Sequence, residues 1–144
     1  MRIRMLIAAA LTTAVVVCAA TPAAEASQRK QMVRAINFVR SWGHHRHLGF
    51  SKRLAGGASA WARHLMRRNV LAHSAGAMRR REGEIIEWHT GSRAKINKVV
   101  IEWLHSPAHR HVMLAHGYRR AGAGKAVGYM NGRRSVIWVV RFAR

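Results

Sequence analysis

Acidic residues are scarce in this sequence. Its 144 residues include five glutamates and no aspartate, against 26 lysines and arginines. A Ser-His-Asp triad is therefore excluded, and no G-x-S-x-G nucleophile motif supports a triad with glutamate instead. The few glutamates also disfavour two-carboxylate glycosidases and multi-carboxylate nuclease metal sites. The sequence thus argues against the commonest hydrolytic sites built on carboxylates.

Cysteine is almost absent as well. Cys18 is the only one, and it lies in the apolar run 5–20, between Arg2 and Arg4 and the small-residue site Ala24-Glu25-Ala26. This pattern is typical of a secretory signal peptide, and the run is short for a membrane span. We therefore predict a signal peptide at 1–26 and a secreted domain at 27–144 that has no disulfide and no stable transmembrane anchor after cleavage. An uncleaved N-terminal anchor is the alternative.

Positive charge dominates what is present. The formal net charge of +21 produces a field that attracts anionic polymers and surfaces. Anionic polymers or lipids of the cell envelope are therefore candidate partners. Nucleic acid could bind only through its phosphates, because no sequence-reading motif is present. A well-solvated basic surface without a partner is the other interpretation, and the oligomeric state is not indicated.

Hydrophobic spacing, capping residues and turn signals predict the order of elements. Helices are expected at 27–42, at 51–69 with Ser51 as N-cap, and at 92–105 with Ser92 as N-cap. Ser106-Pro107 should end the last of these and start a new helix, because proline disfavours helix in the residue before it and suits a first helical position. Strands are expected at 84–88 and on both sides of the Asn131-Gly132 turn. Antiparallel strands covered by helices predict an α+β fold.

Ten histidines supply most of the candidate ligands. His44, His45 and His47 crowd one loop and could bind a transition metal, although a solvated polar loop is the simpler interpretation. His105 and His109 have the helical spacing of a metal-binding pair, but Pro107 interrupts the helix between them. Glu84 begins an apolar strand, so an inward-facing carboxylate there would need partners. Either histidines or one of the many arginines could supply them.

Four segments resemble the CAP superfamily, also called the SCP-like extracellular or pathogenesis-related-1 domain, and its bacterial members above all. They are "LAHS" at 71–74, "GEIIEW" at 83–88, "VVIEWLHSPAHRHVML" at 99–114 and "YRRAGAGKAVG" at 118–128. The resemblance implies a three-layer α-β-α sandwich with a cleft formed by His73, Glu84 and His109. It also implies that His73 and His109 could bind a divalent metal such as zinc.

The sequence departs from the family pattern at two places. Ile85 replaces the asparagine of the Gly-Glu-Asn motif, and Ser106 stands where eukaryotic members have the second acid. Glu102, one helical turn earlier, is a possible accessory residue. Three hypotheses follow: an extracellular binding module whose cleft takes a divalent metal or a small or lipidic ligand, a module that binds anionic polymer, and a metal-assisted hydrolase. A non-enzymatic role is favoured over the third.

Overall fold

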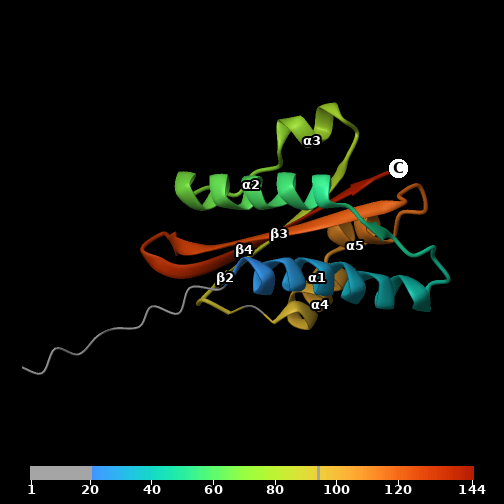
Figure 1. Cartoon of the computed structure of the whole chain (residues 1–144), viewed down its shortest axis with the longest axis horizontal. Coiled ribbons are helices and arrows are strands. Elements are labelled where there is room, and N and C mark those ends of the chain that lie inside the picture. The colour runs from blue at the N-terminus through green and yellow to red at the C-terminus, as the bar shows by residue number, and fades with distance from the viewer. Residues whose placement is uncertain (1–20, 94) are drawn as a thin grey trace, which may run out of the picture.

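Figure 1 presents the computed structural model, which describes residues 21–93 and 95–144. The predicted signal peptide lies mostly outside these residues, as does Cys18, and the cleavage site stays a prediction. The described elements are α1 (Pro22–Trp42), β1 (Gly49–Phe50), α2 (Lys52–Arg68), α3 (Ala75–Arg79), β2 (Gly83–Thr90), α4 (Ile96–His105), α5 (Pro107–Leu114), β3 (Arg120–Met130) and β4 (Arg133–Ala143).

The four described strands form one mixed sheet in the order β1-β3-β4-β2. The hairpin of β3 and β4 turns at Asn131-Gly132, where both residues have positive φ, as the sequence predicts. Strand β2 runs antiparallel to β4 along one edge, and two-residue β1 runs parallel to β3 at the other. In this register Glu84 of β2 lies directly opposite Arg141 of β4.

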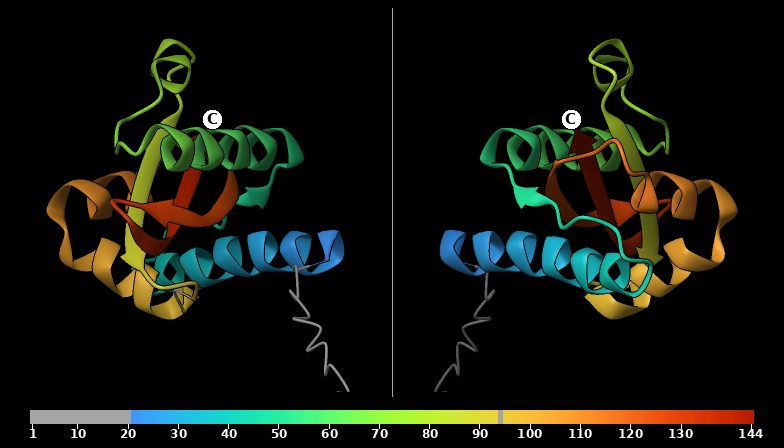
Figure 2. Two further views of the ribbon diagram at one scale, coloured as in Figure 1. Left: turned by 90° about the vertical axis from the view of Figure 1, so that its left-hand side faces the viewer. Right: turned by 90° about the vertical axis from the view of Figure 1, so that its right-hand side faces the viewer.

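Helices cover both faces of the sheet, in the three-layer α-β-α arrangement that the sequence predicts. Helix α2 lies on one face, and α1, α4 and α5 lie on the other (Figures 1 and 2). Each interface has its own apolar core. Bulky side chains such as Trp103 and Phe142 fill the core beneath α1, α4 and α5, whereas alanines and Leu65 dominate the core beneath α2.

Two glycines of β3 allow α2 to lie very close to the sheet. A Cβ atom at Gly122 would collide with the backbone between Leu54 and Ala55, and one at Gly124 would collide with the backbone at Ser59. Backbone of a helix and backbone of a strand thus meet with no side chain between them. The two glycines of the "GAG" segment therefore set the spacing of this layer.

The break between α4 and α5 is confirmed, and Ser106 precedes α5 without a capping hydrogen bond from its side chain. Helix α4 ends at His105 and α5 begins at Pro107, with Ser106 between them in an extended conformation. The Ser106 carbonyl accepts from Arg110 N at 2.9 Å, whereas its side chain makes no capping hydrogen bond. The proline alone therefore suffices to interrupt the helix.

Other predicted boundaries also need correction. Helix α4 begins at Ile96 with Lys95 as N-cap, so Ser92 does not cap it. Ser92 lies instead in a bend beside Gly91, whose φ of +96° turns the chain away from β2 before the helix begins. Short helix α3 and short strand β1 form in segments for which the sequence predicts no element. The Ser51 cap is confirmed, because its side chain accepts from Leu54 N.

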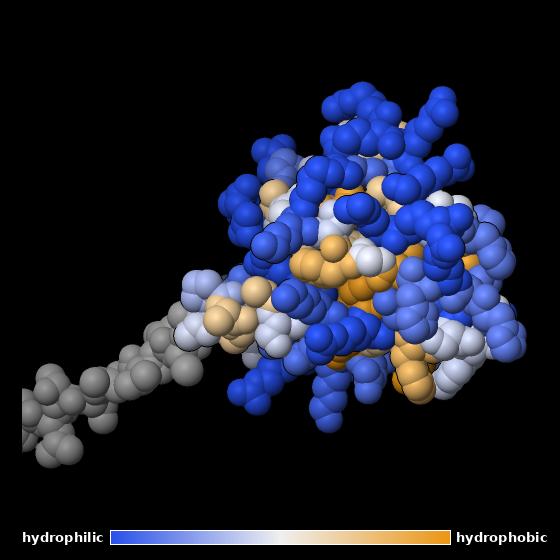
Figure 3. Space-filling model, turned by 45° about the vertical axis from the view of Figure 1, so that its right-hand side comes forward, coloured by the Kyte–Doolittle hydropathy of each residue, from blue (hydrophilic) through white to orange (hydrophobic). Residues whose placement is uncertain are grey.

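Hydrophilic residues cover most of the face shown in Figure 3, with a hydrophobic area exposed between them. Among the described residues, no helix combines the length and apolar character needed to cross a membrane.

Candidate functional site

Glu84 is buried at the beginning of β2, with 4% of its side chain exposed. Its Oε2 accepts from Arg141 Nε at 3.0 Å, and its Oε1 accepts from the backbone N of Ser74 at 2.8 Å. His73 Nδ1 lies 3.2 Å from the same Oε1. The two interpretations of Glu84 from the sequence therefore both apply, because the carboxylate pairs with an arginine and also contacts a histidine.

Arg141 reaches Glu84 through a space that a glycine leaves in α2. A Cβ atom at Gly57 would lie 2.6 Å from Arg141 Nη1. Of the adjacent pair Gly56-Gly57, only the second glycine is closely packed, because a Cβ at Gly56 would meet nothing within 4 Å. The glycine weakens α2 locally but accommodates the guanidinium that neutralises Glu84.

His73 lies in a segment whose neighbouring residues are both anchored. On one side, Trp61 Nε1 donates to the carbonyl of Ala72 at 3.0 Å. On the other, Ser74 accepts from Ala77 N as the cap of α3 and donates its own backbone N–H to Glu84. The His73 side chain itself is 55% exposed. The anchored backbone therefore fixes the position of the His73 Cα atom, and the contact with Glu84 orients the ring through Nδ1.

His109, in the first turn of α5, lines a pocket together with His73. The pocket has a volume of about 190 Å³ and is lined by Leu71, Ala72, His73, Ile86 and His109. His109 Nδ1 is buried and has no hydrogen-bond partner among the described residues. Burial lowers the pKa of His109; Glu87 opposes this shift and His73 adds to it. A neutral imidazole is the form that binds metal ions.

The structure thus brings His73, Glu84 and His109 together, but Glu84 is already committed. Arg141, Ser74 and His73 occupy its two oxygens, so its role in this arrangement is to hold the His73 ring in one orientation. With His73 Nδ1 directed at Glu84, Nε2 is the ring nitrogen left to face a ligand. The chemistry available in this pocket is that of two imidazoles within an apolar lining.

Glu102 and Ser106 do not line this pocket. Glu102 lies beside His89 of β2, with 2.9 Å between Glu102 Oε2 and His89 Nε2. Glu87 completes this second group, in which one ligand atom from each of the three residues lies within 4.8 Å of the others. Sequence reasoning did not single out Glu87 or His89. The sequence indicates that Glu87 and His89 share one face of β2, but it does not indicate that α4 packs against that face.

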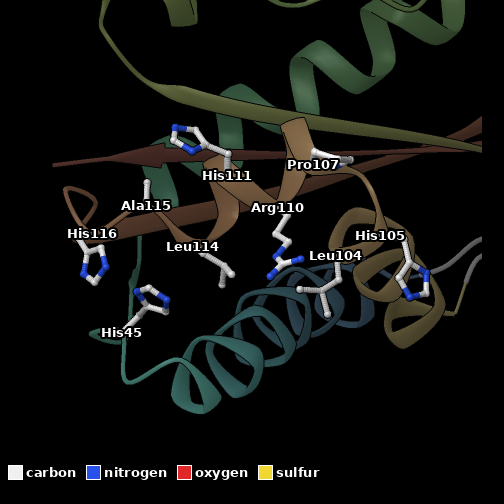
Figure 4. A pocket seen from close by; sticks show the side chains of 9 residues that line it. All are labelled: His45, Leu104, His105, Pro107, Arg110, His111, Leu114, Ala115 and His116. Carbon is white, nitrogen blue, oxygen red and sulfur yellow. The ribbon is translucent and has the colours of Figure 1, made fainter.

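A larger hollow lies between the end of α1 and the α4–α5 corner (Figure 4). Its volume is about 630 Å³. Its lining is apolar residues together with His45, His105, Arg110, His111 and His116, and no glutamate lines it. His45 and His116 lie side by side, 4.4 Å between ring centroids. Burial lowers the pKa of His45, and His116, Arg40 and His44 lower it further. The permanent positive charge of Arg110 and the absence of a lining glutamate favour anions in this hollow.

The crowded histidine loop does not form one cluster. His45 turns toward His116, whereas His47 Nε2 lies 2.7 Å from Ser41 Oγ. The three histidines His44, His45 and His47 are not brought together as a set of metal ligands in the part of the chain that the structure describes. The interpretation of this segment as a polar loop therefore fits its geometry better than a metal site does.

A three-layer sandwich, a G-x-G strand in contact with a helix, and two histidines that meet at the sheet edge define the class of SCP-like domains. Comparison with family models agrees: the model described as "CAP: Cysteine-rich secretory protein family" matches residues 33–142. The chain belongs to this family, as the sequence motifs indicate. It does so without any cysteine in the described residues.

Solved structures support the same fold. An outer surface protein from Borrelia burgdorferi superposes with a TM-score of 0.62 at 19% identity, covering 80% of this chain and 91% of that one. An extracellular protein containing an SCP domain from Bacillus anthracis gives a TM-score of 0.65 at 19% identity, covering 88% of this chain and 44% of that one. Comparison with curated proteins gives no significant match. At these identities the likeness shows the fold alone.

Proposed function

We propose that this protein is a secreted binding module whose pocket between His73 and His109 takes a divalent metal ion or a small ligand. The observation that carries the proposal is that two histidines from distant elements line one pocket, with a buried nitrogen of His109 left unpartnered among the described residues. Secretion is supported by the signal-peptide pattern at 1–26, and the described residues contain no candidate membrane-spanning helix.

The residues fit a zinc ion better than a hard cation. Imidazole nitrogen suits zinc and similar transition metals, whereas magnesium and calcium prefer oxygen ligands. Two histidines leave positions on the metal for water or for a small anionic ligand. Glu84 would hold the His73 ring in place through Nδ1 without contacting the metal. With two protein ligands, the affinity should be modest.

Calorimetric titration of the purified protein with zinc chloride tests this proposal. We expect saturable binding that a His73→Ala/His109→Ala double variant loses at this pocket. His64→Ala is the matched control, because it removes a histidine that stacks on Trp61 outside the pocket. Zinc binding that the double variant retains in full would reject the pocket as the metal site.

A second candidate function is the binding of an anionic polymer of the cell envelope. The hollow of Figure 4 supports it, because histidines and Arg110 line it and no acid does. Binding of this kind should weaken steeply as salt concentration rises, because it releases counterions. A titration with a teichoic-acid-type polymer at several salt concentrations would test it, and affinity that is absent or independent of salt would reject it.

A metal-assisted hydrolase is the third hypothesis. Against it, Glu84 already contacts Arg141, Ser74 and His73 and does not line the pocket, so it is poorly placed to serve as a general base. Absence of turnover on peptide, ester and glycan substrates with added zinc would end it.

A further inference from the structure

The five glutamates of this chain fall into two groups by their partners. Three of them pair closely with arginines: Glu25 with Arg29, Glu82 with Arg53 and Arg80, and Glu84 with Arg141. Glu87 has no lysine or arginine within ion-pair distance in the described residues, and Glu102 has only Lys98 at 3.9 Å. In a chain with 26 basic residues, two carboxylates without an arginine partner are an exception that needs a physical reason.

These two exceptional carboxylates lie together, with a histidine between them. Glu87 and His89 share one face of β2, because they are two residues apart on a strand. Glu102 reaches them from α4. One ligand atom from each residue lies within 4.8 Å of the other two. Two like charges placed so close repel each other unless a cation compensates them.

The contact of His89 with Glu102 has the length of an ion pair but not the geometry of a hydrogen bond. Their atoms Nε2 and Oε2 are 2.9 Å apart, yet both are buried and neither has a properly angled hydrogen-bond partner among the described residues. Ligand atoms bound to one zinc ion at about 2.0–2.2 Å lie roughly 3.3–3.6 Å apart in tetrahedral geometry. A small outward shift of either side chain would therefore seat an ion between them.

Packing holds the two elements in register around this group. Trp103, the neighbour of Glu102, is fully buried, and its Nε1 donates to the carbonyl of Ile86 on β2 at 3.5 Å. This contact sets the position of α4 along the length of β2. The side chains of His89 and Glu102 are 15% and 36% exposed, so the group is held by the fold but is open to solvent. An ion could therefore enter without unfolding.

We propose that Glu87, His89 and Glu102 form a second binding site, for a divalent transition-metal cation such as Zn²⁺, separate from the pocket between His73 and His109. Two carboxylates neutralise the charge of the ion, and the imidazole favours zinc over magnesium. Three protein ligands leave a coordination position open to water or substrate. The proposal does not depend on the function proposed above.

Zinc titration of the purified protein in the His73→Ala/His109→Ala background tests this site alone. We expect this variant to retain saturable zinc binding and a zinc-dependent rise in Tm. Adding Glu102→Gln or His89→Gln should lower the remaining affinity at least about tenfold. His64→Gln is the matched control, because it makes the same change at a histidine of α2 that stacks on Trp61 outside the group, and it should leave zinc binding unchanged. Magnesium should not replace zinc.

The outcomes separate the two sites. Loss of all zinc binding in the His73→Ala/His109→Ala variant would overturn the second site and support the first. Equal binding with and without Glu102→Gln and His89→Gln would also overturn it, placing the remaining zinc on other histidines. Because glutamine keeps the size of glutamate, the zinc-free Tm of Glu102→Gln should match that of its parent, which shows that the variant folds. Broadening or shifting of the His89 ring signals in NMR on addition of zinc would give independent support.

Discussion

Two carboxylates of strand β2 lie in contrasting surroundings, one near its beginning and one in its second half. Glu84, at the beginning, is nearly inaccessible and is bound by Arg141 and the Ser74 amide. Glu87, three residues later and on the opposite face, has no guanidinium partner among the described residues and lies near His89 and Glu102. One glutamate of β2 thus has its charge and hydrogen-bonding capacity taken up by protein groups, whereas the other is free to contact a ligand.

This difference indicates that burial and ion pairing with arginine, more than residue type, decide which carboxylates can bind a ligand. A carboxylate whose lone pairs are taken by an arginine and a backbone amide contributes to stability and to the orientation of His73. A carboxylate beside another carboxylate gains stability from a cation. The structural acid and the candidate ligands are therefore distinguished by their partners, and variants at each end should behave differently.

The largest effect is expected at the Glu84 end. Glu84→Gln leaves the buried Arg141 guanidinium without a counter-charge, which should lower the free energy of unfolding by about 3–5 kcal/mol. Urea denaturation measures it. Glu87→Gln, a matched change on the same strand, should alter stability by less than about 1 kcal/mol. Equal losses in the two variants would show that the ends of β2 do not differ.

The next largest change in stability is expected when zinc is added, through the proposed site of Glu87, His89 and Glu102. A ligand that binds only the folded state stabilises it by about 2.7 kcal/mol at a free concentration one hundred times its Kd. We expect zinc to raise the free energy of unfolding by this order in a His73→Ala/His109→Ala background, and by about 1.4 kcal/mol or less at the same zinc concentration once Glu102→Gln has lowered the affinity tenfold or more. Denaturation with and without zinc measures it. Stabilisation that Glu102→Gln leaves undiminished would mean that the carboxylates of this group do not bind the ion.

Local sequence signals predicted much of the fold because the deciding interactions are local. Pro107 breaks the helix through its own ring, and Asn131-Gly132 forms its turn through its own backbone preferences. The prediction of Ser92 as N-cap was wrong, because a serine near a predicted start does not specify which residue begins the helix, and α4 begins at Ile96. Strand β1 depends on its pairing with β3, which no local pattern contains. Helix α3 has a local signal in its N-cap Ser74, but its five residues are too few to show a helical hydrophobic repeat.

The candidate site divides in the same way. Motif spacing indicated His73, Glu84 and His109, and the structure places the two histidines at one pocket with Glu84 behind His73. The sequence could not identify Arg141 as the partner of Glu84, because that contact requires the β2–β4 register. It could not bring Glu102 to His89 either, because the packing of Trp103 determines how α4 lies along β2.

Without metal, the Glu87 group should contribute little to stability. Glu102→Gln removes one charge from a half-exposed contact with His89, so we expect the free energy of unfolding to change by less than about 0.5 kcal/mol. Urea denaturation in the presence of a chelator measures this value. A loss of several kcal/mol would indicate that the contact of Glu102 with His89 is structural, like that of Glu84 with Arg141.

The smallest effect concerns His109, whose pKa responds to Glu87 and to His73, the histidine beside Glu84. Burial lowers its pKa below the usual value of 6.5, Glu87 raises it and His73 lowers it. The unfolded chain therefore binds a proton at this position more readily than the folded protein does. Stability should consequently fall as pH drops below about 6.5, and His109→Asn should remove that part of the pH dependence.

NMR titration of the His109 ring gives the sharper measurement. We expect its pKa to lie below the usual value of 6.5, and Glu87→Gln to lower it further because the opposing negative charge is removed. The double change Glu87→Gln/His73→Ala should bring it partly back, since His73 acts in the opposite direction. A His109 pKa that Glu87→Gln leaves unchanged would mean that the two ends of β2 are electrostatically independent.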